Sequence, residues 1–132
     1  MIYLDACILI YALEDDGDPG DAVRRAMASA RVPLATSPLV LPECLAMPLR
    51  TRNHALRDSY LAVYEQLEIV ELNTEAYLRA AELRADHGLK TPDALHLAAA
   101  QLSEAEQLWT NDKRLAKASR GLAVDIVGDP LL

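Results

Sequence analysis

The chain has 132 residues, of which 52% are hydrophobic and only 5% aromatic, and it contains no Phe. This length and composition fit one ordinary domain, residues 1–132, with a core built of small aliphatic side chains. The formal net charge of −7 excludes a general attraction of the whole surface to nucleic acid, but it leaves room for a local basic patch.

Membrane segments and disulfides are not expected. The longest apolar runs, residues 7–13 and 38–41, are far shorter than the roughly 20 residues that a membrane-spanning helix needs. No signal peptide pattern begins at Met1, so we expect a cytoplasmic protein. Cys7 and Cys44 are too few for a disulfide framework and match no zinc spacing, which favours buried thiols in a reducing compartment.

Short β-prone runs alternate with helical patterns along the whole sequence. In chain order the patterns predict strand 1–4, helix 7–14, turn 15–21, helix 21–31, strand 34–36, helix 38–50, helix 54–67, strand 69–72, helix 75–87, a helix starting at 91, strand 107–110, helix 111–119 and strand 124–127. Such alternation is typical of a mostly parallel sheet covered on both faces, and it predicts a three-layer α/β/α sandwich.

Several helix starts carry capping signals. Asn53, Thr74 and Thr91 each precede an apolar periodic segment and are predicted N-caps. Ser37 is a predicted cap for the helix at 38–50, within which Pro42 should remove one backbone hydrogen bond; alternatively the helix starts at Pro42 itself. Either start places an acidic residue, Glu43, near the helix beginning.

Four carboxylates fall where a parallel sheet collects its ligands, outside the carboxyl ends of the strands. Asp5 follows the first strand, and Asp112 follows the strand that ends at Thr110. Glu43 begins a helix soon after the second strand. Considered by itself, Asp93 is an ordinary acidic residue in a first helical turn, where the helix dipole stabilises it. It joins the other acids if the start of its helix is folded over the same edge of the sheet.

Converging carboxylates repel one another unless a cation lies between them. An all-oxygen environment suits Mg²⁺ or Mn²⁺, and a metal so held serves phosphoryl chemistry. Other carboxylate-rich α/β sites fit less well. A haloacid-dehalogenase-like phosphatase needs a second Asp where this sequence has Cys7, and the acidic pair and late Lys of a receiver domain are missing.

The segments MIYLDACILI, SPLVLPECL, TPDALHLAAA and LWTNDKRL together resemble the PIN-domain family and, more narrowly, the VapC-type toxins of toxin–antitoxin pairs. The resemblance covers nearly the whole sequence in the right order. It implies a PIN-like fold and a Mg²⁺- or Mn²⁺-dependent endoribonuclease that hydrolyses RNA phosphodiester bonds. It also implies a cognate antitoxin protein and a homodimer.

The resemblance also implies roles for individual residues. The family's four acidic positions match Asp5, Glu43, Asp93 and Asp112. Asp5, Asp93 and Asp112 are the implied principal metal ligands, and Glu43 is implied to position a second metal or the attacking water. Thr110 matches the family's usual hydroxyl residue, which steadies the site by hydrogen bonding, and Asn111 matches a frequent neighbour.

Two positions depart from the family pattern. Cys7 stands where Ser, Thr or Asn is usual, and Pro42 directly before Glu43 is less usual and could shift that helix. We expect His96 to be packed or to face a partner rather than to carry protons. Lys113, Arg114 and Lys117 follow the last acid and are candidate contacts for RNA phosphates.

Two other functions stay open. One is a non-catalytic PIN-fold module that binds proteins, and the other is a PIN ribonuclease that processes RNA without an antitoxin. The sequence does not identify the RNA target or the number of metal ions.

Overall fold

The computed structural model describes residues 1–128 and contains a central five-stranded sheet with the strand order β3-β2-β1-β4-β5. Every neighbouring pair of strands runs parallel. The strands are β1 (Ile2–Leu4), β2 (Leu34–Thr36), β3 (Glu68–Ile69), β4 (Gln107–Trp109) and β5 (Ala123–Val124). The predicted parallel sheet is therefore confirmed. The strand order reverses between β1 and β4, because β2 and β3 are added on one side of β1 and β4 and β5 on the other.

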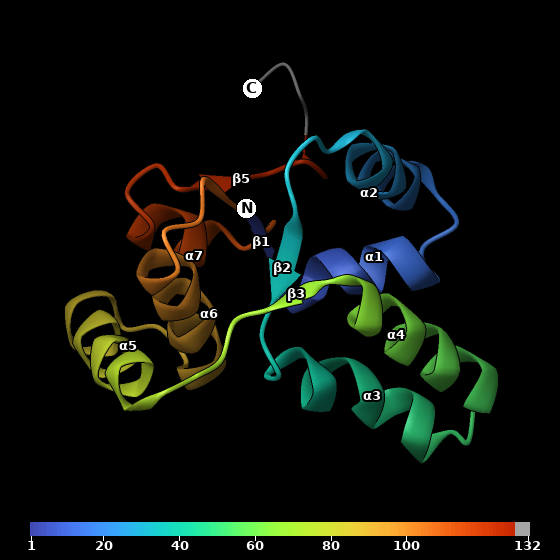
Figure 1. The fold of residues 1–132 in the computed structure, drawn as a ribbon, viewed down its shortest axis with the longest axis horizontal. Helices are drawn as coiled ribbons and strands as arrows, with labels where there is room; N and C mark the ends of the chain where they lie inside the picture. The colour runs from blue at the N-terminus through green and yellow to red at the C-terminus, as the bar shows by residue number, and fades with distance from the viewer. Residues whose placement is uncertain (129–132) are drawn as a thin grey trace.

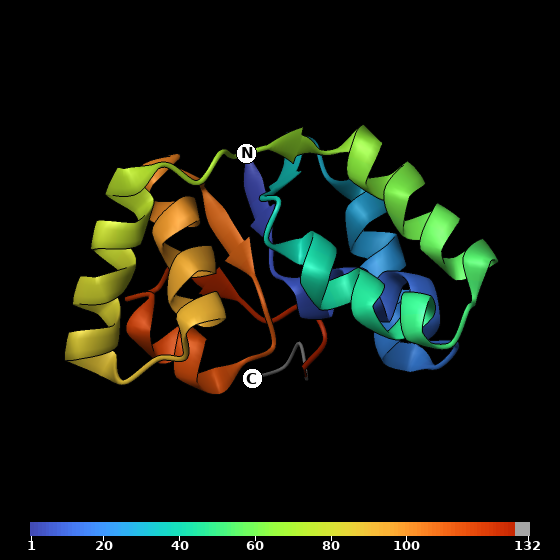
Figure 2. The same cartoon turned by 90° about the horizontal axis from the view of Figure 1, so that it is seen from below.

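Helices cover both faces of this sheet (Figures 1 and 2). The helices within residues 1–128 are α1 (Ala6–Glu14), α2 (Asp18–Ser29), α3 (Val40–Arg50), α4 (His54–Gln66), α5 (Thr74–His87), α6 (Thr91–Leu102) and α7 (Lys113–Ala118). Figure 1 shows α5, α6 and α7 on one side of the sheet and α1 to α4 on the other. The predicted α/β/α sandwich is confirmed.

The alternation of side chains along β1 explains the two layers. Successive residues of a strand point to opposite faces. Tyr3 packs into the core cluster formed with α5, α6 and α7. Ile2 and Leu4 pack into the second cluster, which the sheet forms with α1 to α4. A three-residue strand thus connects both halves of the core and ends at Asp5.

Helix α6 is the most deeply buried helix in the described part of the chain. Every residue from Ala94 to Ala100 is buried, because small Ala side chains let the helix lie close against the sheet and against α5. The burial fixes the position of Asp93 in the first turn of α6.

The predicted strands and helices are confirmed in order and type, but some boundaries differ. Helix α2 begins at Asp18, inside the predicted turn, since Pro19 and the acidic residues suit a first helical turn. Strand β3 lies at Glu68–Ile69, and β5 lies at Ala123–Val124. Both edge strands are shorter than predicted. Each of them pairs with a single neighbouring strand, and the pairing stops where the chain leaves the sheet.

Of the predicted N-caps Asn53, Thr74 and Thr91, two are wrong by one residue. Asn53 caps α4 as predicted and accepts a hydrogen bond from the Leu56 amide. At α5 the cap is Asn73 rather than Thr74. At α6 Lys90 occupies the cap position without a side-chain bond, and Thr91 is the first helical residue. Asn73 and Thr74 are both suitable N-caps by local preference, so tertiary packing decides which of them begins the helix.

Neither predicted start of α3 is correct. Ser37 and Pro38 belong to a turn, and α3 begins at Val40. Pro42 lies in the first turn, where amide groups have no helical partner, so the expected loss of a backbone hydrogen bond does not occur. The proline in the helix interior is Pro48.

No helix within residues 1–128 is both long and apolar enough to cross a membrane.

Candidate active site

Asp5 is held at the carboxyl end of β1 by three hydrogen bonds, in one of which its own amide is the donor. Its backbone amide donates to the Trp109 carbonyl oxygen at 3.1 Å, which ties β1 to β4. As N-cap of α1, its Oδ1 accepts a bond from the Ala6 amide at 2.7 Å. Its Oδ2 accepts a bond from the Thr110 hydroxyl at 2.7 Å. With only 6% of the residue exposed, Asp5 is an oriented carboxylate at the base of the site.

Thr110 connects this carboxylate to the next acid. Its hydroxyl also accepts a bond from the Asp112 amide at 3.1 Å. Asp112 in turn caps α7, because its Oδ1 accepts bonds from the amides of Arg114 and Leu115 at 2.9 and 3.0 Å. The other carboxylate oxygen of Asp112 is not used by this cap.

Glu43 enters the site from the first turn of α3. Its Oε1 lies 2.6 Å from Nε2 of His96, a residue of α6 with a fully buried side chain. The same Nε2 lies 3.7 Å from Oδ1 of Asp5. The structure places His96 in the interior, as one predicted alternative had it, but its contact with Glu43 was not anticipated. Contacts between residues 53 positions apart leave no local sequence signal.

Asp93 reaches the site from the beginning of α6. Burial raises the pKa of the Asp93 carboxyl, and the nearby carboxylates of Asp112 and Asp5 raise it further. The His96 imidazole acts in the opposite direction, and Glu43 adds to the increase. Asp93 therefore lies close to several other negatively charged carboxylates.

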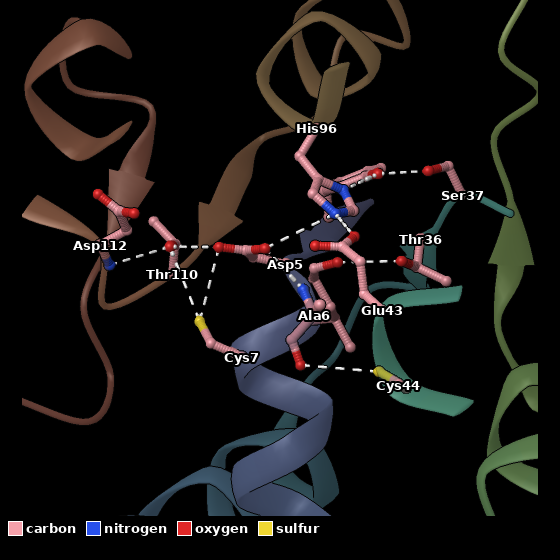
Figure 3. A network of polar contacts seen from close by, with 12 residues as sticks. Asp5, Ala6, Cys7, Thr36, Ser37, Glu43, Cys44, His96, Thr110 and Asp112 are labelled. Atoms are coloured by element: carbon pink, nitrogen blue, oxygen red, sulfur yellow. Dashed lines mark hydrogen bonds and ion pairs between the residues drawn. The ribbon is translucent and has the colours of Figure 1, made fainter. Parts of the chain in front are cut away.

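All four acids line one pocket with a volume of about 440 Å³. The remaining lining residues are Ala6, Cys7, Ile10 and Asn111. Figure 3 shows Asp5 between Thr110 and Glu43, with Asp112 on the far side of Thr110. The side-chain amide of Asn111 donates to the Tyr11 hydroxyl at 2.9 Å, so α1 holds Asn111 at the rim.

Cys7 partly replaces the hydroxyl group expected at its position. Its sulfur lies 3.6 Å from Oδ2 of Asp5 and 3.9 Å from the Thr110 hydroxyl. Burial raises the pKa of the Cys7 thiol to about 12, so at neutral pH the group is a protonated, weak donor to Asp5. Both Cys7 and Cys44 are free thiols.

The donor chemistry of the pocket fits a hard divalent cation, although the present side-chain arrangement is not a closed coordination shell. Within residues 1–128, no three His, Cys, Asp or Glu side chains are arranged to hold a metal ion. Both Asp5 oxygens accept hydrogen bonds from protein groups, and one oxygen of Glu43 lies 2.6 Å from Nε2 of His96. Asp93 and Asp112 line the same pocket, and their carboxylates are the kind of ligand that a hard divalent cation would take.

The raised pKa of Asp93 predicts how Asp93→Asn changes stability in metal-free buffer. A carboxyl whose pKa is higher in the folded than in the unfolded protein adds to the free energy of unfolding at a pH below its unfolded pKa. This added stability is lost as the pH rises through its folded pKa, because the charged form is disfavoured in the folded protein. Asp93→Asn should therefore be more stable than wild type at pH 7, by on the order of 0.5 kcal/mol for a partly exposed charge. The difference should shrink toward pH 4. Urea unfolding in EDTA at both pH values measures it, and a variant less stable at pH 7 would contradict the repulsion.

The predicted RNA-contact residues lie beside the acids but line a different pocket. Lys113, Arg114 and Lys117 border it on α7, and Asp86 and His87 border it at the end of α5. Because Asp112 caps α7, this basic surface begins directly at the acidic pocket.

The acidic pocket lies where the strand order of the parallel sheet reverses, which is the usual place of a ligand site in an open α/β sheet. A profile of the PIN domain matches residues 2–121. The chain belongs to the PIN domain family, and this confirms the resemblance drawn from its four acidic segments. No curated protein sequence matches it.

A toxin and two complexes with toxin–antitoxin names are among the solved structures of similar fold. One is a toxin–antitoxin complex from Klebsiella pneumoniae, with 21% identity, a TM-score of 0.78, and coverage of 96% of this chain and 98% of that one. VapC20 from Mycobacterium tuberculosis, described as a sarcin–ricin loop cleaving toxin, has 17% identity and a TM-score of 0.77, covering 89% and 95%. VapBC2 from Rickettsia felis, bound to a promoter DNA fragment, has 22% identity and a TM-score of 0.73, covering 94% and 98%.

Proposed function

We propose that this protein is a Mg²⁺- or Mn²⁺-dependent endoribonuclease and the toxin of a toxin–antitoxin module. The observation that carries the proposal is the convergence of Asp5, Glu43, Asp93 and Asp112 on one pocket. Mutually repelling carboxylates destabilise a fold unless they serve a cation. Membership of the PIN domain family and the fold of VapC20 support the same activity.

In this proposal each acid has a task. Asp5, Asp93 and Asp112 hold a divalent cation, which would activate water and neutralise charge on the phosphate. Thr110 keeps the Asp5 carboxylate oriented through its 2.7 Å bond. Glu43 orients a water or a second ion from the α3 side. Lys113, Arg114 and Lys117 would bind phosphates of the RNA beside the cleaved bond.

The proposed partners are an antitoxin protein and a second copy of the chain. Large apolar side chains are exposed on two helices: Met47 and Leu49 on α3, and Tyr77 and Leu78 on α5. Exposed apolar surface is typical of protein contacts. The toxin–antitoxin complexes of similar fold support an antitoxin as one of them.

The decisive test is cleavage of a tRNA and rRNA mixture by antitoxin-free protein. We expect cutting with Mg²⁺ or Mn²⁺ and none in EDTA. Asp93→Asn, prepared identically, should lose at least about 100-fold in rate, since one ligand charge is removed. Circular dichroism provides the control for folding.

Each other outcome has a definite meaning. Cutting that survives Asp93→Asn would point to a contaminating nuclease or to a wrong assignment of the site. A folded wild type that cuts with neither metal would favour a non-catalytic binding module. An active protein without an antitoxin gene beside its own would be an RNA-processing nuclease.

A further inference from the structure

A buried series of hydrogen bonds runs from the end of β2 to the acidic pocket. The Tyr3 hydroxyl donates to Oγ of Ser37 at 2.8 Å and lies 2.7 Å from Nδ1 of His96. On its other side, Nε2 of the imidazole lies 2.6 Å from Oε1 of Glu43. In Figure 3 the imidazole of His96 lies above Glu43, and Ser37 lies to one side of it. We refer to Ser37, Tyr3, His96 and Glu43 as the buried series.

We propose that His96 is a positioning residue for Glu43, and that Tyr3 and Ser37 set the orientation of its imidazole. The inference rests on the proposed function, because it assigns a purpose to the carboxylate of Glu43 in cleavage. It goes beyond the four acids, since neither Tyr3 nor Ser37 lines the pocket.

The burial of these polar groups supports a specific purpose. Ser37, Tyr3 and His96 are each 0% exposed, and a buried hydroxyl or imidazole is costly unless it is hydrogen-bonded. Apolar residues could fill the same volume without any polar groups. All three side chains have partners instead, and no buried side-chain polar atom within residues 1–128 is left without one.

Tyr3 fixes the imidazole in two ways. Its hydroxyl bonds Nδ1, which distinguishes the two ring edges. Its ring meets the imidazole edge-on, with centroids 5.6 Å apart and planes at 62°. Without the hydroxyl, the imidazole could turn over and present a carbon to Glu43. With it, Nε2 is held toward Glu43 and lies 3.7 Å from Oδ1 of Asp5.

Glu43 needs such a fixed partner. It has a flexible side chain that is 27% exposed, and α3 begins without a side-chain cap. Beside the carboxylates of Asp5 and Asp93, an unrestrained glutamate would rotate toward water. The bond to His96 holds it over the pocket before any substrate arrives, which is how a preorganised site avoids reorganisation during the reaction.

Tyr3→Phe tests the proposal, because it removes one hydroxyl and keeps the ring. We expect kcat for RNA cleavage to fall about 10-fold, as for a slightly misplaced catalytic group, with KM within about twofold. Tyr60→Phe is the matched control. Tyr60 is also buried, and its hydroxyl bonds a carboxylate outside the pocket, that of Glu14. Tyr60→Phe should leave kcat and KM within about twofold of the wild-type values, because Tyr60 lies outside the site.

A second readout needs no catalysis. In metal-free protein, ¹⁵N imidazole spectra report the hydrogen bonds of each ring nitrogen, and His96→Gln identifies the signals of His96. We expect both Tyr3→Phe and Glu43→Gln to move these signals. Tyr60→Phe should leave them in place.

The two readouts together decide the proposal. The proposal would be overturned if Tyr3→Phe kept the wild-type kcat. It would also be overturned if the His96 signals stayed unchanged in Tyr3→Phe or in Glu43→Gln. Loss of kcat together with shifted signals would support it. If the wild type cleaves no RNA, the proposed function fails, and the imidazole spectra alone show whether Tyr3 orients His96 against Glu43.

Discussion

Asp112→Asn is expected to lose about 100-fold or more in RNA cleavage without any loss of stability. An asparagine oxygen can still accept the bonds from the amides of Arg114 and Leu115, and Asn caps helices about as well as Asp. The substitution removes only the negative charge that a bound cation would need from this position. Cleavage rates with Mn²⁺ and urea unfolding in EDTA measure the two effects.

Asp112→Ala separates chemistry from capping. It should lose the same activity and, in addition, about 1 kcal/mol of stability, the usual cost of removing an N-cap. If Asp112→Asn kept wild-type activity, the acid would serve only as the cap of α7. If Asp112→Ala were as stable as wild type, the capping geometry would be wrong.

Leu97→Ala is expected to destabilise the fold by about 2–5 kcal/mol, because it leaves a cavity in a well-packed core. Leu97 is 0% exposed and lies on α6 in the core cluster with Tyr3. The same helix carries Asp93 and His96, so its loosening should also lower cleavage at temperatures near the unfolding midpoint. Denaturant unfolding gives the free energy directly.

Leu102→Ala on the same helix is the matched control. Leu102 is 39% exposed, and the substitution should cost less than about 1 kcal/mol. A cost below 1 kcal/mol for Leu97→Ala as well would mean that α6 is not packed as described.

The sequence predicted the layers of this fold because its local patterns agree with one another. The strand 34–36 was predicted with the bounds that β2 has, and the β1 and β4 segments were predicted to within a residue. Acids placed directly after strands lie at the carboxyl edge of a parallel sheet by geometry alone. Asp5 and Asp112 could therefore be assigned to one edge without any knowledge of side-chain contacts.

Other features depended on interactions that local rules do not include. Asn73 and Lys90, not Thr74 and Thr91, occupy the cap positions, and α3 begins at neither predicted residue. Asn and Thr are both favoured N-caps, so local preference does not separate Asn73 from Thr74, and at α6 a lysine occupies the position although threonine is the better cap. The packing of each helix on the sheet therefore selects the start.

What the sequence determined by itself is the alternation of strands and helices and the four acids that follow it, because both depend on residues a few positions apart. What only the tertiary structure decided is which groups hold those acids. His96 meets Glu43 across 53 positions and Tyr3 across 93. Such contacts exist only when α6 packs on β1 beside α3, since long-range hydrogen bonds form from the fold as a whole.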